Sequence, residues 1–261
     1  MNFIITNPRS PGTKFNEYTD NIILACYKIL NSKTSEHGAY KDLRIELEAA
    51  GVSKNTYLRN IFSFLKFCGF VFYERGIDIN YKNFFTKLGY MYIETIKTEH
   101  LIISNNEMEE MKKKNALMEV DKMKSILILE GIKNILSSSD CTYVNVFRNI
   151  INFLLEFNSI DENEFALLLF KQQHNELDKI KSLRDIINQY RNKEIELHFI
   201  SEKTKEIESE TDNSRKIPSF AYFLDILASA RITYKDEEYG KRYYLNQSTL
   251  KNTLETLGGL L

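Results

Sequence analysis

Apolar residues recur at intervals of three and four positions through most of this chain. A helix brings such positions onto one side, so the spacing is typical of helices with one buried face. The 261 residues include only 3 prolines and 10 glycines, the residue types that most often end a helix. The spacing and the scarcity of helix-ending residues together predict a mainly helical protein.

The first half of the chain contains one change of pattern. Helices are predicted over 20–30, 40–50, 53–68 and 82–96. Between the last two, the runs FVFYE and IDINY are β-branched and aromatic, and the turn residues Arg75-Gly76 separate them. These runs predict a two-stranded hairpin. Three helices followed by a hairpin is the winged helix-turn-helix arrangement.

A similar order of elements returns near the end of the chain. An apolar helix beginning near Pro218 precedes two predicted strands, RITYKD and KRYYLN, and Ser248 is placed to cap a closing helix. Before them lie an amphipathic helix over 177–190 and the apolar segment DENEFALLLF. In that segment Asp161 and Glu164 have the spacing of a capping box.

We therefore expect an α+β protein that is mainly α with small β-hairpin wings, in which a helical connector joins two winged helix-turn-helix units. The predicted divisions are an N-terminal winged-helix domain with a basic arm (1–99), a connector (100–140) and a C-terminal helical domain ending in a second winged-helix-like unit (141–261). Residues 100–116 are charged and polar, and are either a linker or the exposed front of a helix reaching Ile135. Residues 1–18 are either a solvated tail or a basic arm lying on an anionic partner.

The third predicted helix carries the clearest candidate for a binding surface. Its back is apolar, so packing would hold its polar front rigidly outward, and the major groove of B-DNA is wide enough for one helix. Arg59 could pair with guanine, and Asn55 or Asn60 with adenine, while residues at the helix start and on the hairpin turn suit phosphates. The predicted DNA-contacting residues of this unit are Ser53, Lys54, Asn55, Thr56, Arg59, Asn60, Ser63, Lys66 and Arg75. The alternative is a polar face that contacts only solvent.

Charge is unevenly distributed along the chain, although the net charge is only −1. Residues 51–90 contain two acidic residues and six basic ones: Lys54, Arg59, Lys66, Arg75, Lys82 and Lys87. A local basic excess suits a face turned toward an anion. A weaker second contact surface is predicted at Arg231, Lys241 and Arg242. Acidic residues crowd the same turn, so a purely structural hairpin is the alternative there.

Several functional classes are disfavoured by the sequence. Cys26, Cys68 and Cys141 lie apart in apolar stretches without metal-ligand spacing, which indicates reduced core residues in an intracellular protein. No signal-like or membrane-spanning apolar run occurs, so we expect a cytoplasmic protein without a membrane partner. The four histidines are scattered, and no nuclease, phosphate-loop or nucleophile-elbow motif is present. We therefore predict no catalytic residues, metal ligands or cofactor in this chain.

Four stretches carry a resemblance to a known family: GVSKNTYLRNIFSFLKFCGFV, FFTKLGYMYI, SIDENEFALLLF and FAYFLDILASARITY. They resemble the N-terminal recognition half of type IIS restriction and nicking endonucleases, in particular the AlwI-like group. The resemblance implies sequence-specific binding of double-stranded DNA. It also implies cleavage by a C-terminal nuclease domain, which this chain lacks. The chain would then be the recognition part alone, and Mg²⁺ would be needed only by a separate nuclease domain or subunit.

Other readings remain open at this point. A winged-helix transcription regulator or replication initiator would be expected to dimerise, most simply through the long helix predicted at 106–137. A protein-interaction adaptor would bind no nucleic acid, and a complete nuclease with a degenerate site is a further possibility. Salt-dependent binding to duplex DNA separates the adaptor from the others.

Overall fold

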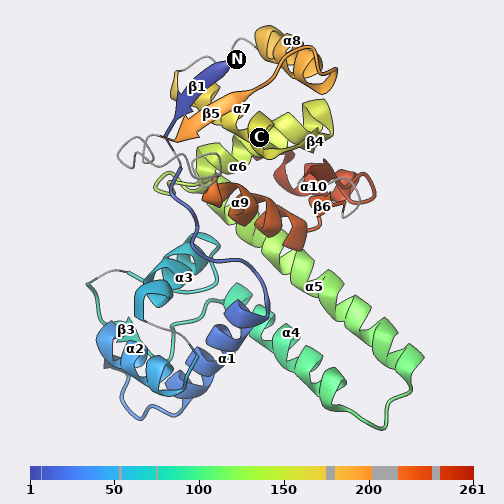
Figure 1. Ribbon diagram of the computed structural model, residues 1–261. Coiled ribbons are helices and arrows are strands. Elements are labelled where there is room, and N and C mark those ends of the chain that lie inside the picture. Colours follow the sequence, from blue (N-terminus) through green and yellow to red (C-terminus); the bar gives the residue numbers. More distant parts are fainter. Residues whose placement is uncertain (7, 53–54, 75, 175–179, 202–216, 237–241) are drawn as a thin grey trace.

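The computed structural model describes the whole chain except residues 7, 53–54, 75, 175–179, 202–216 and 237–241. The described part is mainly helical with small sheets (Figure 1), as the apolar spacing predicts. Its elements in chain order are β1 (Asn2–Ile5), α1 (Glu17–Asn31), β2 (His37–Gly38), α2 (Tyr40–Ala49), α3 (Asn55–Phe67), β3 (Ile79–Asn80), α4 (Lys87–Ser104), α5 (Glu110–Ser137), α6 (Val144–Phe157), β4 (Ser159–Ile160), α7 (Glu162–Gln173), α8 (Ile180–Arg191), β5 (His198–Ser201), α9 (Pro218–Ser229), β6 (Thr233–Lys235), β7 (Tyr243–Leu245), α10 (Leu250–Leu257) and the 3₁₀ turn η3 (Gly258–Leu260).

Strand pairing in the N-terminal part differs from the predicted hairpin. β3 pairs antiparallel with β2, far back in the sequence. The segment after Phe70 instead pairs with Phe84 and Phe85. Val71 forms an antiparallel β-bridge with Phe85, and the Phe72 amide donates a hydrogen bond of 2.7 Å to the Phe84 carbonyl. Both phenylalanines are buried, so core packing draws them beside this segment. The pairing of FVFYE with IDINY is therefore wrong.

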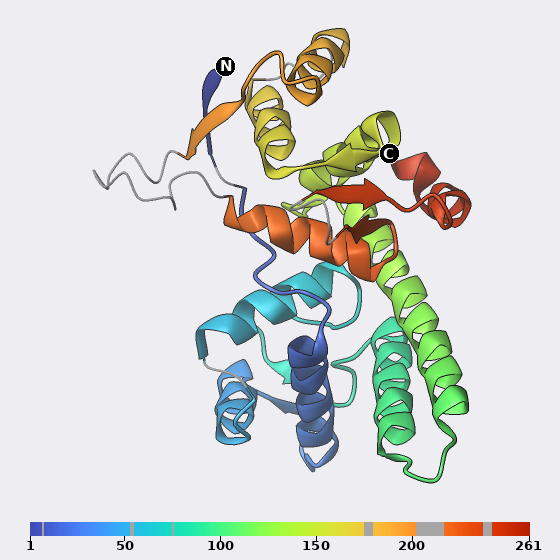
Figure 2. The ribbon, with the colours of Figure 1, turned by 45° about the vertical axis from the view of Figure 1, so that its right-hand side comes forward.

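The charged stretch 100–116 contains a helix end, a turn and a helix start. α4 begins after its cap Thr86 and ends at Ser104, and α5 begins at Glu110. The two helices lie side by side and extend away from the rest of the molecule (Figures 1 and 2). α5 then continues into the C-terminal part, where it packs against α6, α9 and α10, and it also contacts α3. This single helix therefore connects the two halves of the fold.

The C-terminal part is built around a three-stranded sheet with the order β4-β7-β6. The predicted strands in RITYKD and KRYYLN are confirmed as the antiparallel pair β6 and β7. The predicted capping box is also confirmed, with Asp161 and Glu164 each accepting the other's backbone amide. The closing helix α10 begins after Thr249, one residue beyond the predicted cap.

The N-terminal segment is part of the folded body, so a solvated tail is the wrong interpretation for its first residues. β1 pairs in parallel with β5, and Phe3 and Ile5 are buried. From there the segment descends past α9 to α1 (Figure 2). Along this path Lys14 forms an ion pair with Asp225, and the Phe15 ring packs near the rings of core aromatic residues. The predicted boundary at residue 99 thus separates β1 from its partner strand.

The three cysteines are buried free thiols, as expected for core residues. Burial in apolar surroundings raises the pKa of each thiol above its ordinary value. Within the described ranges, none of the helices combines the length and the apolar character needed to cross a membrane.

Candidate nucleic-acid interface

α3 is anchored by a broad apolar surface. The side chains of Leu58, Ile61, Phe62 and Leu65 are buried, which confirms the predicted inward face for the described residues. Phe64 is buried as well, on a side that the sequence pattern left unassigned, because the Phe15 ring lies 5.9 Å and the Tyr143 ring 6.0 Å from it. α3 is therefore held from two directions, which fixes the orientation of its remaining face.

The outward face of α3 is polar and basic. Arg59, Asn60 and Lys66 are exposed, and Ser63 is half-buried between them. Within the part of the chain that the structure describes, neither Arg59 nor Lys66 forms an ion pair with an acidic side chain. Both charges thus remain free to meet an anion from outside.

A second guanidinium group lies beside this face. Burial raises the pKa of the Tyr40 hydroxyl, Tyr73 adds to the rise, and the positive charges of Arg44 and Arg59 oppose it. The two arginines therefore approach the same tyrosine, one from α2 and one from α3. Arg44 also lies 3.8 Å from the Glu48 carboxylate of its own helix, so its charge is matched within the fold.

The N-terminal segment borders the opposite edge of α3. A side chain at Gly12 (φ +71°) would bring its Cβ within 3.0 Å of the Asn60 Cβ atom. Arg9 is exposed, and the carbonyl of the next residue, Ser10, accepts a hydrogen bond of 3.5 Å from the Tyr143 hydroxyl. Because Tyr143 packs against α3, Arg9 lies beside this helix. Arg9 is the residue of the predicted basic arm that borders the candidate interface.

Several predicted contact residues cannot be placed in this surface. Asn55 and Thr56 lie in the first turn of α3. The predicted contacts Ser53, Lys54, Arg75 and Lys241 lie outside the described residues. The described interface therefore consists of Arg59, Asn60, Ser63 and Lys66, flanked by Arg9.

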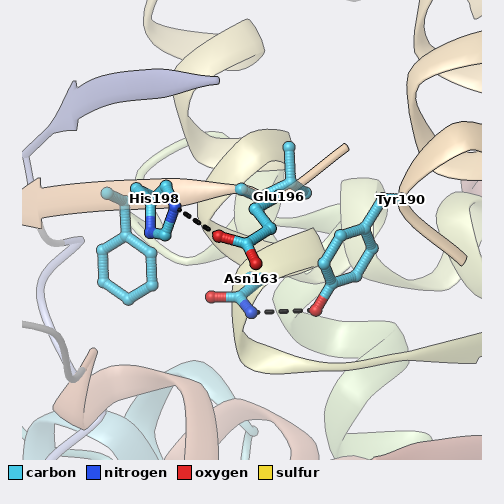
Figure 3. A pocket seen from close by; sticks show the side chains of 6 residues that line it. Asn163, Tyr190, Glu196 and His198 are labelled. Carbon is cyan, nitrogen blue, oxygen red and sulfur yellow. Dashed lines mark hydrogen bonds and ion pairs between the residues drawn. The ribbon is translucent and has the colours of Figure 1, made fainter. Parts of the chain in front are cut away.

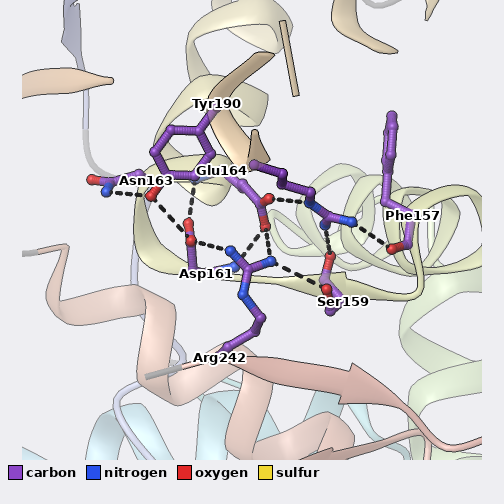
Figure 4. A network of polar contacts seen from close by, with 8 residues as sticks. Phe157, Ser159, Asp161, Asn163, Glu164, Tyr190 and Arg242 are labelled. Atoms are coloured by element: carbon purple, nitrogen blue, oxygen red, sulfur yellow. Dashed lines mark hydrogen bonds and ion pairs between the residues drawn. The ribbon is translucent and has the colours of Figure 1, made fainter. Parts of the chain in front are cut away.

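Arg242 belongs to an internal network rather than to an open surface (Figure 4). Its guanidinium donates to Glu164 at 2.9 Å and to the Ser159 hydroxyl at 3.1 Å, and it also pairs with Asp161. Burial by itself would lower the pKa of Arg242, but Glu164 and Asp161 outweigh that effect and raise it. Arg242 is therefore engaged in the structural hairpin that was the alternative to DNA contact.

Glu164 is the centre of this network and is completely buried. Its second oxygen accepts a hydrogen bond of 2.6 Å from Arg191, whose guanidinium also donates to the carbonyls of Phe157, at the end of α6, and Ser159, in β4. Two arginines therefore neutralise one buried carboxylate and join α6, α7, α8 and β7.

Arg231 is also a poor candidate for the predicted second contact surface. This residue has a left-handed backbone (φ 57°) and forms an ion pair with Asp121 of α5. Because its charge is already matched by a carboxylate within the fold, Arg231 is not retained in the candidate interface.

Comparison with known proteins adds no assignment. The chain has no significant match among protein-family models, curated proteins or solved structures. A search of the described residues also finds no group of three or more His, Cys, Asp or Glu side chains that could hold a metal ion.

Proposed function

We propose that this chain binds double-stranded DNA and that α3 enters the major groove. The observation that carries the proposal is the face of α3, a helix anchored by its apolar back, where Arg59 and Lys66 are exposed and pair with no acidic side chain of the described residues. Such a face combines a guanidinium that can recognise guanine with an amine that can contact phosphate. A basic helix surface held rigidly is a common means of DNA recognition.

The arrangement around α3 supports a winged helix-turn-helix module as the finer description of this unit. α1, β2, α2 and α3 follow one another, and β3 returns to pair with β2. The segment from Phe70 to Phe85 lies after α3, where a wing would be expected. In this proposal the groove-facing side of α3 provides base contacts, and Arg9 provides a flanking phosphate contact.

The C-terminal part repeats this order but is proposed to act as a scaffold. β4 follows α6 and pairs with β7, just as β2 follows α1 and pairs with β3. The helix directly before its hairpin is α9, whose side chains Phe223, Leu224 and Ile226 are buried. α9 carries no lysine or arginine on its half-buried side, so α3 is the better candidate for reading DNA.

We also propose that the DNA-binding chain is the recognition part of a restriction or nicking system. This part of the proposal rests on the four resembling stretches described above. Cleavage would then require a separate nuclease domain or subunit with its Mg²⁺. A transcription regulator or replication initiator remains the alternative if the selected DNA site has two-fold symmetry.

The central test is selection of bound sequences from a pool of random duplexes. We expect one enriched motif and an affinity that falls steeply as salt concentration rises. A nicking assay with Mg²⁺, with and without a candidate nuclease partner, then tests the restriction assignment separately. Absence of both enrichment and salt-dependent binding would favour the adaptor and end the DNA proposal.

Replacing Arg59 with alanine is expected to relax sequence preference at one or two positions of the selected motif. Loss of a bidentate contact with guanine should weaken binding to the preferred site by about 1–3 kcal/mol, with little change for unrelated DNA. Fluorescence anisotropy with the selected duplex and a scrambled duplex measures both affinities. An equal loss on both duplexes would assign Arg59 to the phosphate backbone.

Replacing Lys66 with alanine should instead weaken binding to all duplexes by a similar factor. Removing one phosphate contact should also reduce the slope of log K against log salt by about 1. Lys251→Ala is the matched control, because it removes one exposed lysine from α10, outside the candidate interface. If the control lowers the slope as much as Lys66→Ala, the effect reflects net charge and not the α3 face.

A further inference from the structure

A polar cavity of about 370 Å³ lies where α7 and α8 meet β5 (Figure 3). It is separate from the α3 face. Its lining combines two aromatic residues with polar groups from three elements: Asn163, Tyr190, Glu196, Leu197, His198 and Phe199. An aromatic wall with a few convergent polar groups is typical of small-molecule sites.

The floor of the cavity is held in place by hydrogen bonds. The Tyr190 hydroxyl donates to Asp161 at 3.1 Å and accepts from the Asn163 side-chain amide at 2.8 Å. Asp161 is in turn paired with Arg242 in the buried network. Burial raises the pKa of Tyr190, so its hydroxyl stays protonated. The Asn163 amide nitrogen is thus occupied, while its carbonyl oxygen accepts no hydrogen bond from the described residues.

The rim presents a carboxylate with one oxygen available. One Glu196 oxygen lies 3.0 Å from Nε2 of His198, and the other has no partner among the described residues. The Glu196 side chain is 84% exposed. The backbone carbonyl of Glu196 already accepts a hydrogen bond of 2.6 Å from the N-terminal ammonium of Met1. The free polar groups at the cavity are therefore acceptors, and one of them is negatively charged.

We propose that this cavity binds a small organic ammonium ion with an aromatic or alkyl body. An ammonium group has three donors and no acceptor, which complements the free oxygens of Glu196 and Asn163. The rings of Tyr190 and Phe199 provide an apolar wall for the body of the ligand, and aromatic faces attract cations. A neutral hydroxyl can donate one hydrogen bond to these oxygens but has no charge to match Glu196, and an anionic group would be repelled by it.

Titration of the full chain with phenethylamine, followed by calorimetry, tests the site. Binding should be saturable, and 2-phenylethanol, which has the same body without the charge, should bind at least fivefold more weakly. Glu196→Gln should weaken phenethylamine binding by about fivefold, as expected for an exposed ion pair worth about 1 kcal/mol. DNA binding through α3 should be unchanged in this variant, so the two proposals can fail independently.

The matched control is Glu194→Gln, which removes an acid from the same connection outside the cavity lining. It should bind phenethylamine as the unmodified chain does. The proposal is overturned if phenethylamine does not bind, if the alcohol binds equally well, or if both glutamine variants lose the same affinity.

Discussion

Replacing Glu164 with glutamine is expected to lower the free energy of unfolding by about 3 kcal/mol or more. Breaking a buried ion pair leaves the remaining charge without compensation, at a cost of about 3–5 kcal/mol. Arg191 and Arg242 both donate to Glu164; without that charge Arg191 has no carboxylate partner among the described residues, whereas Arg242 keeps Asp161. Glutamine can still complete the capping box of α7, so the variant isolates the loss of charge from the loss of the cap. Urea denaturation followed by circular dichroism measures the change.

Glu156→Gln provides the comparison for this prediction. Glu156 also pairs with an arginine, Arg184, but both side chains are substantially exposed. Exposed pairs contribute about 0–1 kcal/mol, so this variant should unfold close to the unmodified protein. A loss below about 1 kcal/mol for Glu164→Gln would mean that the buried network contributes no more than a surface pair.

Replacing Gly89 with alanine should destabilise the fold by about 3 kcal/mol, the upper end of the usual range for overpacking. Alanine normally favours a helix by about 1 kcal/mol over glycine. At this position, however, the new Cβ would lie 2.0 Å from the backbone carbonyl oxygen of Phe70, which cannot rotate away as a side chain would. α4 would have to move off the segment that follows α3.

The control for this prediction is Gly258→Ala. No heavy atom lies within 4 Å of a Cβ at residue 258, outside its immediate neighbours, and the residue has an ordinary helical backbone. The urea concentration at which the Gly258→Ala variant is half unfolded should therefore be unchanged or slightly higher. If Gly89→Ala behaves in the same way, α4 does not pack as closely on Phe70 as the geometry requires.

Features set by nearby residues were predictable from the sequence. The capping box at Asp161 depends on a residue three positions later, and the inward face of α3 depends on helical spacing. The β6–β7 pair joins neighbouring runs. In each case the interacting residues are close in the sequence, so the sequence pattern alone indicates the structure.

Features that depend on distant contacts were not predictable in this way. The pairing of β2 with β3 joins two-residue strands, which leave almost no pattern in a sequence. The burial of Phe64 depends on Phe15 and Tyr143. Arg242 was predicted as a DNA contact of the basic hairpin, and its pairing with acidic residues 78 and 81 positions earlier left no local pattern that could reveal it.

The parallel pairing of β1 with β5 has a consequence for the order in which the protein forms. The Met1 ammonium donates to the carbonyl of Glu196, 195 positions later. During synthesis, the first strand must therefore wait until most of the polypeptide has left the ribosome before it finds its partner. Until then Phe3 and Ile5 stay uncovered, and such delayed long-range pairing is a typical occasion for aggregation or chaperone capture.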